Sequence, residues 1–317
     1  MFLFNIIDKL YNVYNSIFFM IKLSYLFIIF LVFFSGCFSN IDKAIIILEK
    51  NKSIEPSKLE FEVKNISNVL KVPVENLTEE NSSRTLNVFD KWQWQLSGEL
   101  NFEYVDEVSV YDIDLFDSKI SDIEFLHSNN IFVICYFSGG TSEDWRSDFS
   151  FFDKSVLGNK LDGWSGERWL DISESDKFGG VMEKRFDLAV KKGCDGVEVD
   201  NVDGYFNENG FDLNYDNQLK YNIWLSEQAK SRDLLIGLKN DLEQVNDLVN
   251  YFDFAVNEQC FEYNECDLLK PFVDAGKPVF GVEYELSKDE FCEKANKLQF
   301  SFLFMTYNLS GERDSCN

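Results

Sequence analysis

The chain has 317 residues, of which 45% are hydrophobic and 16% aromatic, so it can bury a sizeable core and is not intrinsically disordered over most of its length. Its 55 acidic residues outnumber its 30 basic ones, and a net charge of −25 argues against a nucleic-acid partner, which requires a basic face. A single histidine excludes a zinc site built from several histidines, so acid–base chemistry is expected to fall to carboxylates.

An uncharged apolar run over residues 23–36 predicts export from the cytoplasm as part of a signal peptide over 1–36, with Met20 as an alternative start. The run ends in FSGC, which resembles a relaxed bacterial lipobox. This resemblance implies cleavage before Cys37, a lipid on its sulfur, and a lipoprotein anchored to a membrane of the cell envelope or surface. Two alternatives remain open: an ordinary signal peptide, and an uncleaved transmembrane anchor, for which the run is short.

Six further cysteines remain after Cys37, an even number that permits disulfides in an exported protein. Cys260 and Cys266 flank a predicted loop, and Cys292 and Cys316 are placed to staple the C-terminus. Fifteen pairings stay open from sequence alone. Cys135 and Cys194 lie in apolar strand-like runs and are expected to be buried free thiols.

Residues 37–85 are rich in Ser, Asn, Glu and Lys and show no sustained apolar period. This composition predicts a tether that holds a domain over 86–317 away from the membrane surface. The alternative is an extra layer packed on that domain.

Eight short apolar runs follow, each ending in polar or acidic residues. The runs are Trp92–Leu96, Val108–Leu115, Ile131–Phe137, Gly196–Asp200, Leu234–Leu238, Phe252–Asn257, Pro278–Tyr284 and Phe300–Met305. Helical spacings of three and four lie between most of them. Strands alternating with helices predict an α/β fold, a (β/α)8 TIM barrel, with a doubly wound open sheet as the alternative. No glycine-rich phosphate-binding motif follows the first strand, so no nucleotide cofactor is expected.

The ends of these runs carry chemically active side chains. They are Asp112, Asp114, Ser138, Asp200, Asn201, Lys239, Asn240, Glu258, Glu283 and Tyr307. In a TIM barrel the carboxyl ends of the strands form the active site. Converging acidic groups raise one another's pKa and suit either a carboxylate acid–base pair or the binding of a cation. Each could instead cap the helix that follows it.

The strand ends lie within longer motifs: WQWQLSG, YDIDLFD, VICYFSGGTSEDWR, GERWLDI, KGCDGVEVDNVDGY, IGLKND, FAVNEQCFEYNEC and KPVFGVEY. These motifs resemble glycoside hydrolase family 114 over about residues 87–310. The resemblance implies a TIM barrel with endo-α-1,4-polygalactosaminidase activity, which cleaves chains of α-1,4-linked galactosamine. The family's acidic pair matches Asp200 and Glu258. Val199 stands where the family often has proline, which is expected to shift the local backbone without removing the carboxylate.

Glycosidases need one carboxyl group to protonate the leaving oxygen and another to act as nucleophile or base. We expect Glu258 to be the proton donor and Asp200 the nucleophile or base, with the reverse assignment open. Strand alternation places Glu198 on the same side as Asp200 and one layer deeper, as a rival for either role or as a buried partner. The sequence does not distinguish a retaining from an inverting outcome. No cofactor and no metal are expected, although carboxylate clusters can hold Ca²⁺.

Aromatic side chains are candidate sugar-stacking walls, with core packing as the alternative. Trp92 and Trp94 alternate with glutamines and therefore share one face of their strand, and Tyr111 and Trp145 are weighed in the same way. Lys239 is expected to temper the acidity of the cavity or to form an ordinary salt bridge. The remaining predicted substrate contacts are polar: Asp112, Asp114, Glu198, Asn201 and Glu283.

The sequence therefore predicts a surface-tethered glycoside hydrolase that acts on an α-1,4-linked galactosamine polymer. An acidic domain would attract such a cationic polysaccharide, an effect that weakens as ionic strength rises. Two alternatives remain: a lipoprotein that binds a glycan or another partner without turnover, and a hydrolase of this fold acting on a different glycan.

Overall fold

The computed structural model describes residues 85–317. The predicted signal peptide over 1–36, the lipidation at Cys37 and all but the last residue of the predicted tether over 37–85 lie outside the described residues. Within the described part of the chain, no helix combines the length and the apolarity that a membrane crossing needs.

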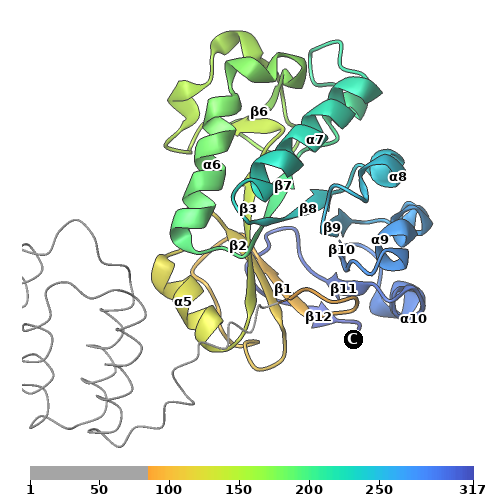
Figure 1. Cartoon of the computed structure of the whole chain (residues 1–317). Helices are drawn as coiled ribbons and strands as arrows, with labels where there is room; N and C mark the ends of the chain where they lie inside the picture. Colours follow the sequence, from red (N-terminus) through yellow and green to blue (C-terminus); the bar gives the residue numbers. More distant parts are fainter. Residues whose placement is uncertain (1–84) are drawn as a thin grey trace, which may run out of the picture. The chain divides into compact units, whose positions relative to one another are not determined.

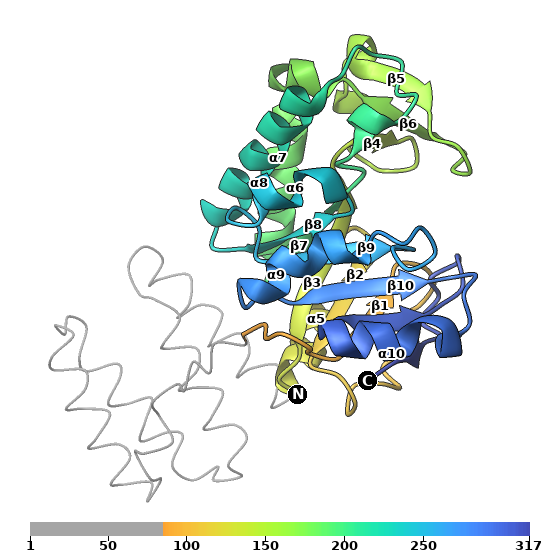
Figure 2. The ribbon, with the colours of Figure 1, turned by 90° about the vertical axis from the view of Figure 1, so that its right-hand side faces the viewer.

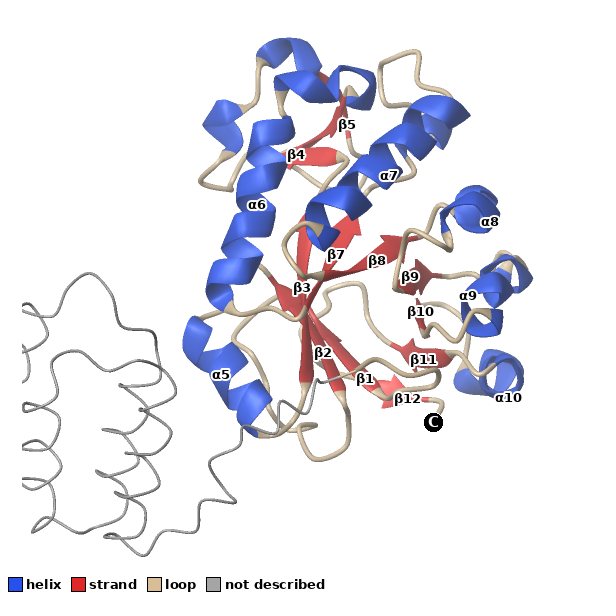
Figure 3. Ribbon diagram, viewed as in Figure 1, coloured by secondary structure: helices blue, strands red, loops and turns tan. Residues whose placement is uncertain are grey.

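A curled sheet of nine strands forms the framework (Figures 1 and 3). Its members are β1 (Trp92–Gln95), β2 (Val110–Asp114), β3 (Phe132–Ser138), β7 (Gly196–Asp200), β8 (Leu235–Lys239), β9 (Phe254–Glu258), β10 (Val279–Glu283), β11 (Ser301–Phe304) and β12 (Asp314–Ser315). The first eight run parallel, follow chain order and coincide with the eight predicted runs. Because the order never reverses, the doubly wound alternative is excluded.

Helices cover the outer face of the sheet (Figure 2). They are α5 (Ile120–Ser128), α6 (Gly179–Lys192), α7 (Tyr215–Lys230), α8 (Val245–Leu248), α9 (Lys270–Asp274) and α10 (Lys288–Leu298). Short 3₁₀ helices span Phe149–Phe151, Lys154–Val156, Ile172–Lys177, Gly204–Phe206, Leu242–Gln244 and Cys266–Leu269. Local sequence sets several boundaries: Ser287 and Glu290 form a capping box at the start of α10, and Gly193, at a φ of 91°, ends α6.

The sheet is TIM-barrel-like, but its hydrogen-bonded ladder is not closed on itself among the described residues. The antiparallel β12 occupies the free edge of β11, and the Trp92 indole donates to the Ser301 carbonyl at 2.9 Å across the seam. No helix lies between β1 and β2. The predicted (β/α)8 barrel is therefore confirmed only in part, as a TIM-barrel-like curled sheet.

Alternation along the strands produces two apolar layers. Side chains at one parity, such as Trp94, Phe132 and Val256, fill the interior of the curled sheet. Those at the other parity, such as Val133 and Ala255, pack in the larger cluster that also contains the buried helix residues. The parity of a strand residue therefore decides whether it can reach the interior where the site lies.

An excursion after β3 forms a second sheet that the sequence did not predict. It consists of β4 (Thr141–Glu143), β5 (Leu157–Lys160) and β6 (Glu167–Leu170), in the order β4-β6-β5 (Figure 2). These strands are short, and their polar sequences TSEDWR and LGNK lack an alternating apolar pattern. They therefore carry no strand signal of their own.

Three disulfides are present in the described residues. Cys260–Cys266 and Cys292–Cys316 confirm the two predicted pairs. The expectation of two buried free thiols was wrong, because the remaining pair, Cys135 and Cys194, is also bonded. Cys135 lies in β3 and Cys194 leads into β7, and these strands are neighbours in the sheet although 59 residues separate the cysteines.

Candidate active site

The centre of the site is the ammonium group of Lys239, which contacts three carboxylates. Its Nζ lies 3.1 Å from Glu198 Oε1, 3.0 Å from Asp200 Oδ1 and 3.2 Å from Glu258 Oε2. Lys239 ends β8, and the two neighbouring strands β7 and β9 end in Asp200 and Glu258. Parallel pairing therefore places one cation between two carboxylates at the carboxyl ends of three adjacent strands.

Asp200 is surrounded by hydrogen-bond donors. Besides Lys239, Oδ1 accepts from the Asn201 backbone N–H at 2.8 Å. Its Oδ2 accepts from the Tyr136 hydroxyl at 2.9 Å and from the Asn201 amide at 3.3 Å. These donors hold the carboxylate in one orientation, as attack by a nucleophile requires.

Glu258 has fewer donors and is more open. Its Oε2 faces Lys239, and its Oε1 accepts from the Tyr284 hydroxyl. The side chain is 29% exposed, against 19% for Asp200. Its backbone N–H donates to Asn240 Oδ1 at 3.0 Å, which fixes the end of β9 against the end of β8. A carboxyl group with few donors and access to solvent is suited to exchange protons.

A deeper layer compensates the lysine. Glu198 is fully buried, and its Oε2 accepts from the Trp94 indole at 3.0 Å. Asp112 is also fully buried, close enough to Glu198 for the two carboxyl groups to influence each other. Burial, and then the negative charge of Glu198, raise the pKa of Asp112 well above its ordinary value. Asp112 therefore favours its protonated, neutral form beside the Glu198 carboxylate.

The charge on Lys239 follows from its neighbours. Burial alone would lower its pKa, but the negative charges of Asp200, Glu258 and Glu198 outweigh burial and raise the pKa well above its usual value. Burial and the nearby carboxylates likewise raise the pKa values of Tyr136 and Tyr284. The lysine is thus permanently charged, and both tyrosines remain donors.

The strand ends turn sharply after these side chains. Asn201, Asn240 and Gln259 directly follow β7, β8 and β9, and each adopts a left-handed backbone with φ of 60°, 51° and 63°. Asparagine tolerates this region better than most residues. The chain therefore leaves the sheet immediately, so that Asp200, Lys239 and Glu258 stand at its rim.

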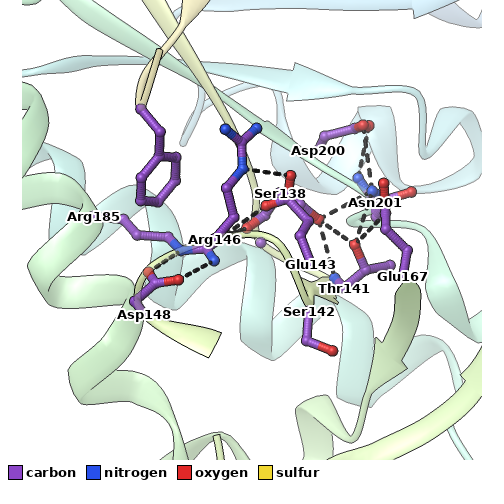
Figure 4. Close-up of polar contacts among 12 residues, drawn as sticks. Ser138, Thr141, Ser142, Glu143, Arg146, Asp148, Glu167, Arg185, Asp200 and Asn201 are labelled. Atoms are coloured by element: carbon purple, nitrogen blue, oxygen red, sulfur yellow. Dashed lines mark hydrogen bonds and ion pairs between the residues drawn. The ribbon is translucent and has the colours of Figure 1, made fainter. Parts of the chain in front are cut away.

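A polar network from the excursion supports Asp200 and Asn201 (Figure 4). The Asn201 amide donates to Ser138 Oγ at 3.1 Å, and Ser138 Oγ lies 2.5 Å from Thr141 Oγ1. Thr141 in turn donates to Glu167 Oε2 at 2.8 Å. Burial raises the pKa of Glu167 to about 7. Thr141 of β4 and Glu167 of β6 therefore help to fix the position of the turn at Asn201.

Asp114 is a structural anchor. It pairs with Arg146 at 2.5 Å and accepts from the Phe116 and Asp117 backbone N–H groups, both at 2.8 Å. Arg146 also pairs with Glu143 at 2.8 Å. The expectation that Asp114 binds substrate is thus replaced by a role in tying β2 to β4.

Several predicted substrate contacts are placed elsewhere by the structure. The side chains of Tyr111 and Glu283 point away from the interior of the curled sheet, toward the helices. Glu283 accepts a hydrogen bond there from the Phe261 N–H at 2.8 Å. Trp92 points inward but is fully buried against Trp94 and Phe280. These three expectations are corrected, because none of the side chains has a surface open to a sugar.

Burial also limits the roles of the deeper residues. Asp112, Glu198 and Trp94 are at most 1% exposed, so they act on the site through Lys239 rather than on a substrate. Among the predicted aromatic contacts, Trp145 is open to solvent at 50%.

Three residues near the site were not singled out by the sequence. Tyr136 and Tyr284 share the inward parity of Ile134 and Val282, a signal that the alternation of their strands contains. Asp203 lies three residues after Asp200, and its pKa rises to about 6 through burial and the charge of Asp200. Within residues 85–317, no group of three or more His, Cys, Asp or Glu side chains is arranged to hold a metal ion.

Comparisons with known proteins agree with this geometry. The model of glycoside-hydrolase family GH114 matches residues 75–317. The crystal structure of Aspergillus fumigatus Ega3 in complex with galactosamine superposes with a TM-score of 0.70 at 40% identity, over 73% of this chain and 96% of that one. The glycoside hydrolase domain of PelA from Pseudomonas aeruginosa shares the fold, with a TM-score of 0.57 at 12% identity over 71% and 98%. A search of curated proteins finds no match.

Proposed function

We propose that this chain, which belongs to glycoside-hydrolase family GH114 and is therefore a glycoside hydrolase, cleaves an α-1,4-linked galactosamine polymer. In this proposal Asp200 and Glu258 are the reacting pair. The carrying observation is that Lys239 holds both carboxylates within 3.2 Å at the rim of the sheet. The galactosamine bound by Ega3, at 40% identity, supports the substrate class.

The two carboxylates are close enough for a double displacement. Since Asp200 Oδ1 and Glu258 Oε2 both contact one nitrogen atom, they lie no more than about 6.2 Å apart. Retaining glycosidases separate their carboxyl groups by about 5–5.5 Å and inverting ones by about 6.5–9.5 Å. The contact therefore favours retention of the anomeric configuration.

The steps follow from the donors around each group. Glu258 gives its proton to the glycosidic oxygen while Asp200 attacks the anomeric carbon, so that the glycosidic bond breaks and a glycosyl ester forms. Glu258, now ionised, then takes a proton from water, and the resulting hydroxide displaces Asp200 from the sugar. Lys239 and Tyr136 hold the Asp200 carboxylate in both steps.

Export is part of the proposal. The apolar run over 23–36 and the FSGC sequence support a signal peptide with a lipid on Cys37, and three disulfides fit an oxidising compartment outside the cytoplasm. A surface-tethered enzyme would thus meet its polysaccharide at the cell envelope.

The test uses purified protein with de-N-acetylated and fully acetylated α-1,4-galactosaminan, and follows reducing ends together with the anomer of the first product by NMR. We expect wild-type release with retained configuration. Asp200→Asn and Glu258→Gln are expected to lose at least 10²–10⁴-fold in turnover. Azide should rescue the two variants differently, giving a β-linked azide with Asp200→Asn and an α-linked azide with Glu258→Gln. Wild-type turnover in both variants, or release from a different glycan alone, would overturn the assignment.

A further inference from the structure

An exposed aromatic ring lies beside the proposed proton donor. Tyr307 follows β11, and its ring stacks on that of Tyr284 with centroids 4.2 Å apart and planes at 24°. Tyr284 is buried and donates its hydroxyl to Glu258. Tyr307 is 55% exposed, so one face of its ring rests on Tyr284 while the side chain remains open to solvent.

The contacts advance one strand at a time around the sheet. Asp200 ends β7, Lys239 ends β8, Glu258 ends β9, Tyr284 follows β10 and Tyr307 follows β11. The two oxygens of Glu258 divide this series, because Oε2 faces Lys239 and Oε1 faces Tyr284. The tyrosine pair therefore lies on the side of Glu258 that is away from Asp200.

The loop that carries Tyr307 is held in place. The Leu309 N–H donates to the Thr306 carbonyl at 3.1 Å, and the Leu309 carbonyl accepts from Leu96 at the end of β1 at 3.0 Å. Ser97 donates to the Asn308 carbonyl at 2.5 Å. The ring is thus positioned before any ligand arrives, which reduces the entropy lost on binding.

An exposed tyrosine ring in a fixed position suits a particular ligand. Pyranose rings present apolar C–H faces that stack on aromatic rings, and the ammonium group of galactosamine gains further from the π-system. We propose that Tyr307 is the stacking platform for the sugar unit on the leaving-group side of the scissile bond. This assignment rests on the proposed function, because the proton donor Glu258 must face the leaving oxygen and the sugar attached to it.

The experiment compares two substrates that share the glycosyl part but differ in the leaving group. One is an α-1,4-galactosamine oligomer, with a sugar on the leaving side, and the other is the shorter oligomer carrying a fluoride leaving group, which has no surface to stack on a ring. We expect Tyr307→Ala to lower kcat/KM about tenfold on the sugar-leaving oligomer, mainly through KM, and to leave kcat/KM on the fluoride substrate within about threefold of wild type. Tyr307→Phe keeps the ring and should match wild type on both.

Two further variants separate binding from folding. Tyr307→Leu keeps an apolar contact on Tyr284 without an aromatic face, and should repeat the selective loss. Tyr251→Ala removes a partly exposed ring that precedes β9, at the other end of the strand from Glu258. It should leave kcat/KM unchanged on both substrates. An equal loss on both substrates in Tyr307→Leu, or no loss on the oligomer, would overturn the platform. Absence of wild-type cleavage of the oligomer would instead refute the proposed function.

Discussion

Replacing Lys239 by methionine removes the cation that contacts all three carboxylates of the site. At about 3 Å and an effective dielectric constant of about 20, each contact has a Coulomb energy of roughly 5 kcal/mol, before desolvation and the mutual repulsion of the carboxylates are subtracted. Removing one partner of a buried ion pair costs about 3–5 kcal/mol. Because Glu198 is fully buried while Asp200 and Glu258 are 19% and 29% exposed, we expect Glu198 to account for most of that loss.

The loss should depend on pH in a defined direction. In the wild type the charge of Lys239 lowers the pKa of Glu198 against the effect of burial. Without it, Glu198 favours its protonated form when folded, so its pKa rises further above the ordinary value of 4.5. A carboxyl group with a raised folded pKa contributes stability below its unfolded pKa and loses it as pH rises. The deficit of Lys239→Met should therefore be smallest near pH 5 and largest near pH 8.

Urea unfolding followed by tryptophan fluorescence at these two pH values measures the deficit. The double variant Glu198→Gln/Lys239→Met should lose less than the sum of the single variants, because the uncompensated charge is then gone. Lys177→Met is the matched control, since its ion pair with Glu174 joins two half-exposed side chains, and it should behave as the wild type. A deficit below about 1 kcal/mol near pH 8, or one that is the same at both pH values, would refute the reasoning.

Two further predictions concern stability. Burial raises the pKa of Glu167 to about 7, so its ionisation destabilises the fold as pH rises from about 4.5 to 7. In urea unfolding, Glu167→Gln should raise the free energy of unfolding by on the order of 1–3 kcal/mol near pH 8 and by little near pH 5. The exposed control Glu124→Gln should leave it unchanged at either pH. Removing the Cys135–Cys194 disulfide with two alanines should cost about 4 kcal/mol, against about 2 kcal/mol for Cys260–Cys266, because the closed segments span 59 and 6 residues. Equal losses for the two disulfides would contradict the chain-entropy account.

The architecture was predictable because each strand is a short apolar run bounded by polar residues. The depth at which each side chain lies inside the curled sheet could not be predicted. Trp92 and Trp94 share the inward face, as their spacing predicts, yet they lie in layers that the interior fills with side chains. Composition does not reveal how far along a strand the packed interior ends and the open rim begins.

Parity explains the errors at the rim. Glu283 is an acidic strand-end residue like Asp200 and Glu258, and by residue type alone it belongs with them. The alternation of Phe280 and Val282 turns it outward and turns Tyr284 inward. Counting from the apolar interior positions would have found the tyrosine, whereas the list of charged residues concealed it.

The disulfide between Cys135 and Cys194 was missed for a different reason. The excursion through β4, β5 and β6 separates β3 from β7 along the chain, and its polar strands carry no periodic signal. The sequence does not show that the chain returns from this excursion to pair β7 with β3, so nothing in it predicts that the two cysteines are close. Their proximity is a consequence of sheet order, which pairs Cys135 with Val197 of the neighbouring strand.

A chain with a net charge of −25 can gather four carboxyl groups at one place because they are arranged in depth. In the lower layer the raised pKa of Asp112 favours its neutral form, and the charge of Glu198 is matched by Lys239. The same ammonium group then faces Asp200 and Glu258 above it, so the net charge of the whole cluster is at most two negative units. That remaining charge lies where solvent and a cationic amino sugar can reach it, and each of the two upper carboxylates keeps one tyrosine donor, Tyr136 or Tyr284. Depth thus separates the carboxyl groups that carry structure from those available for chemistry.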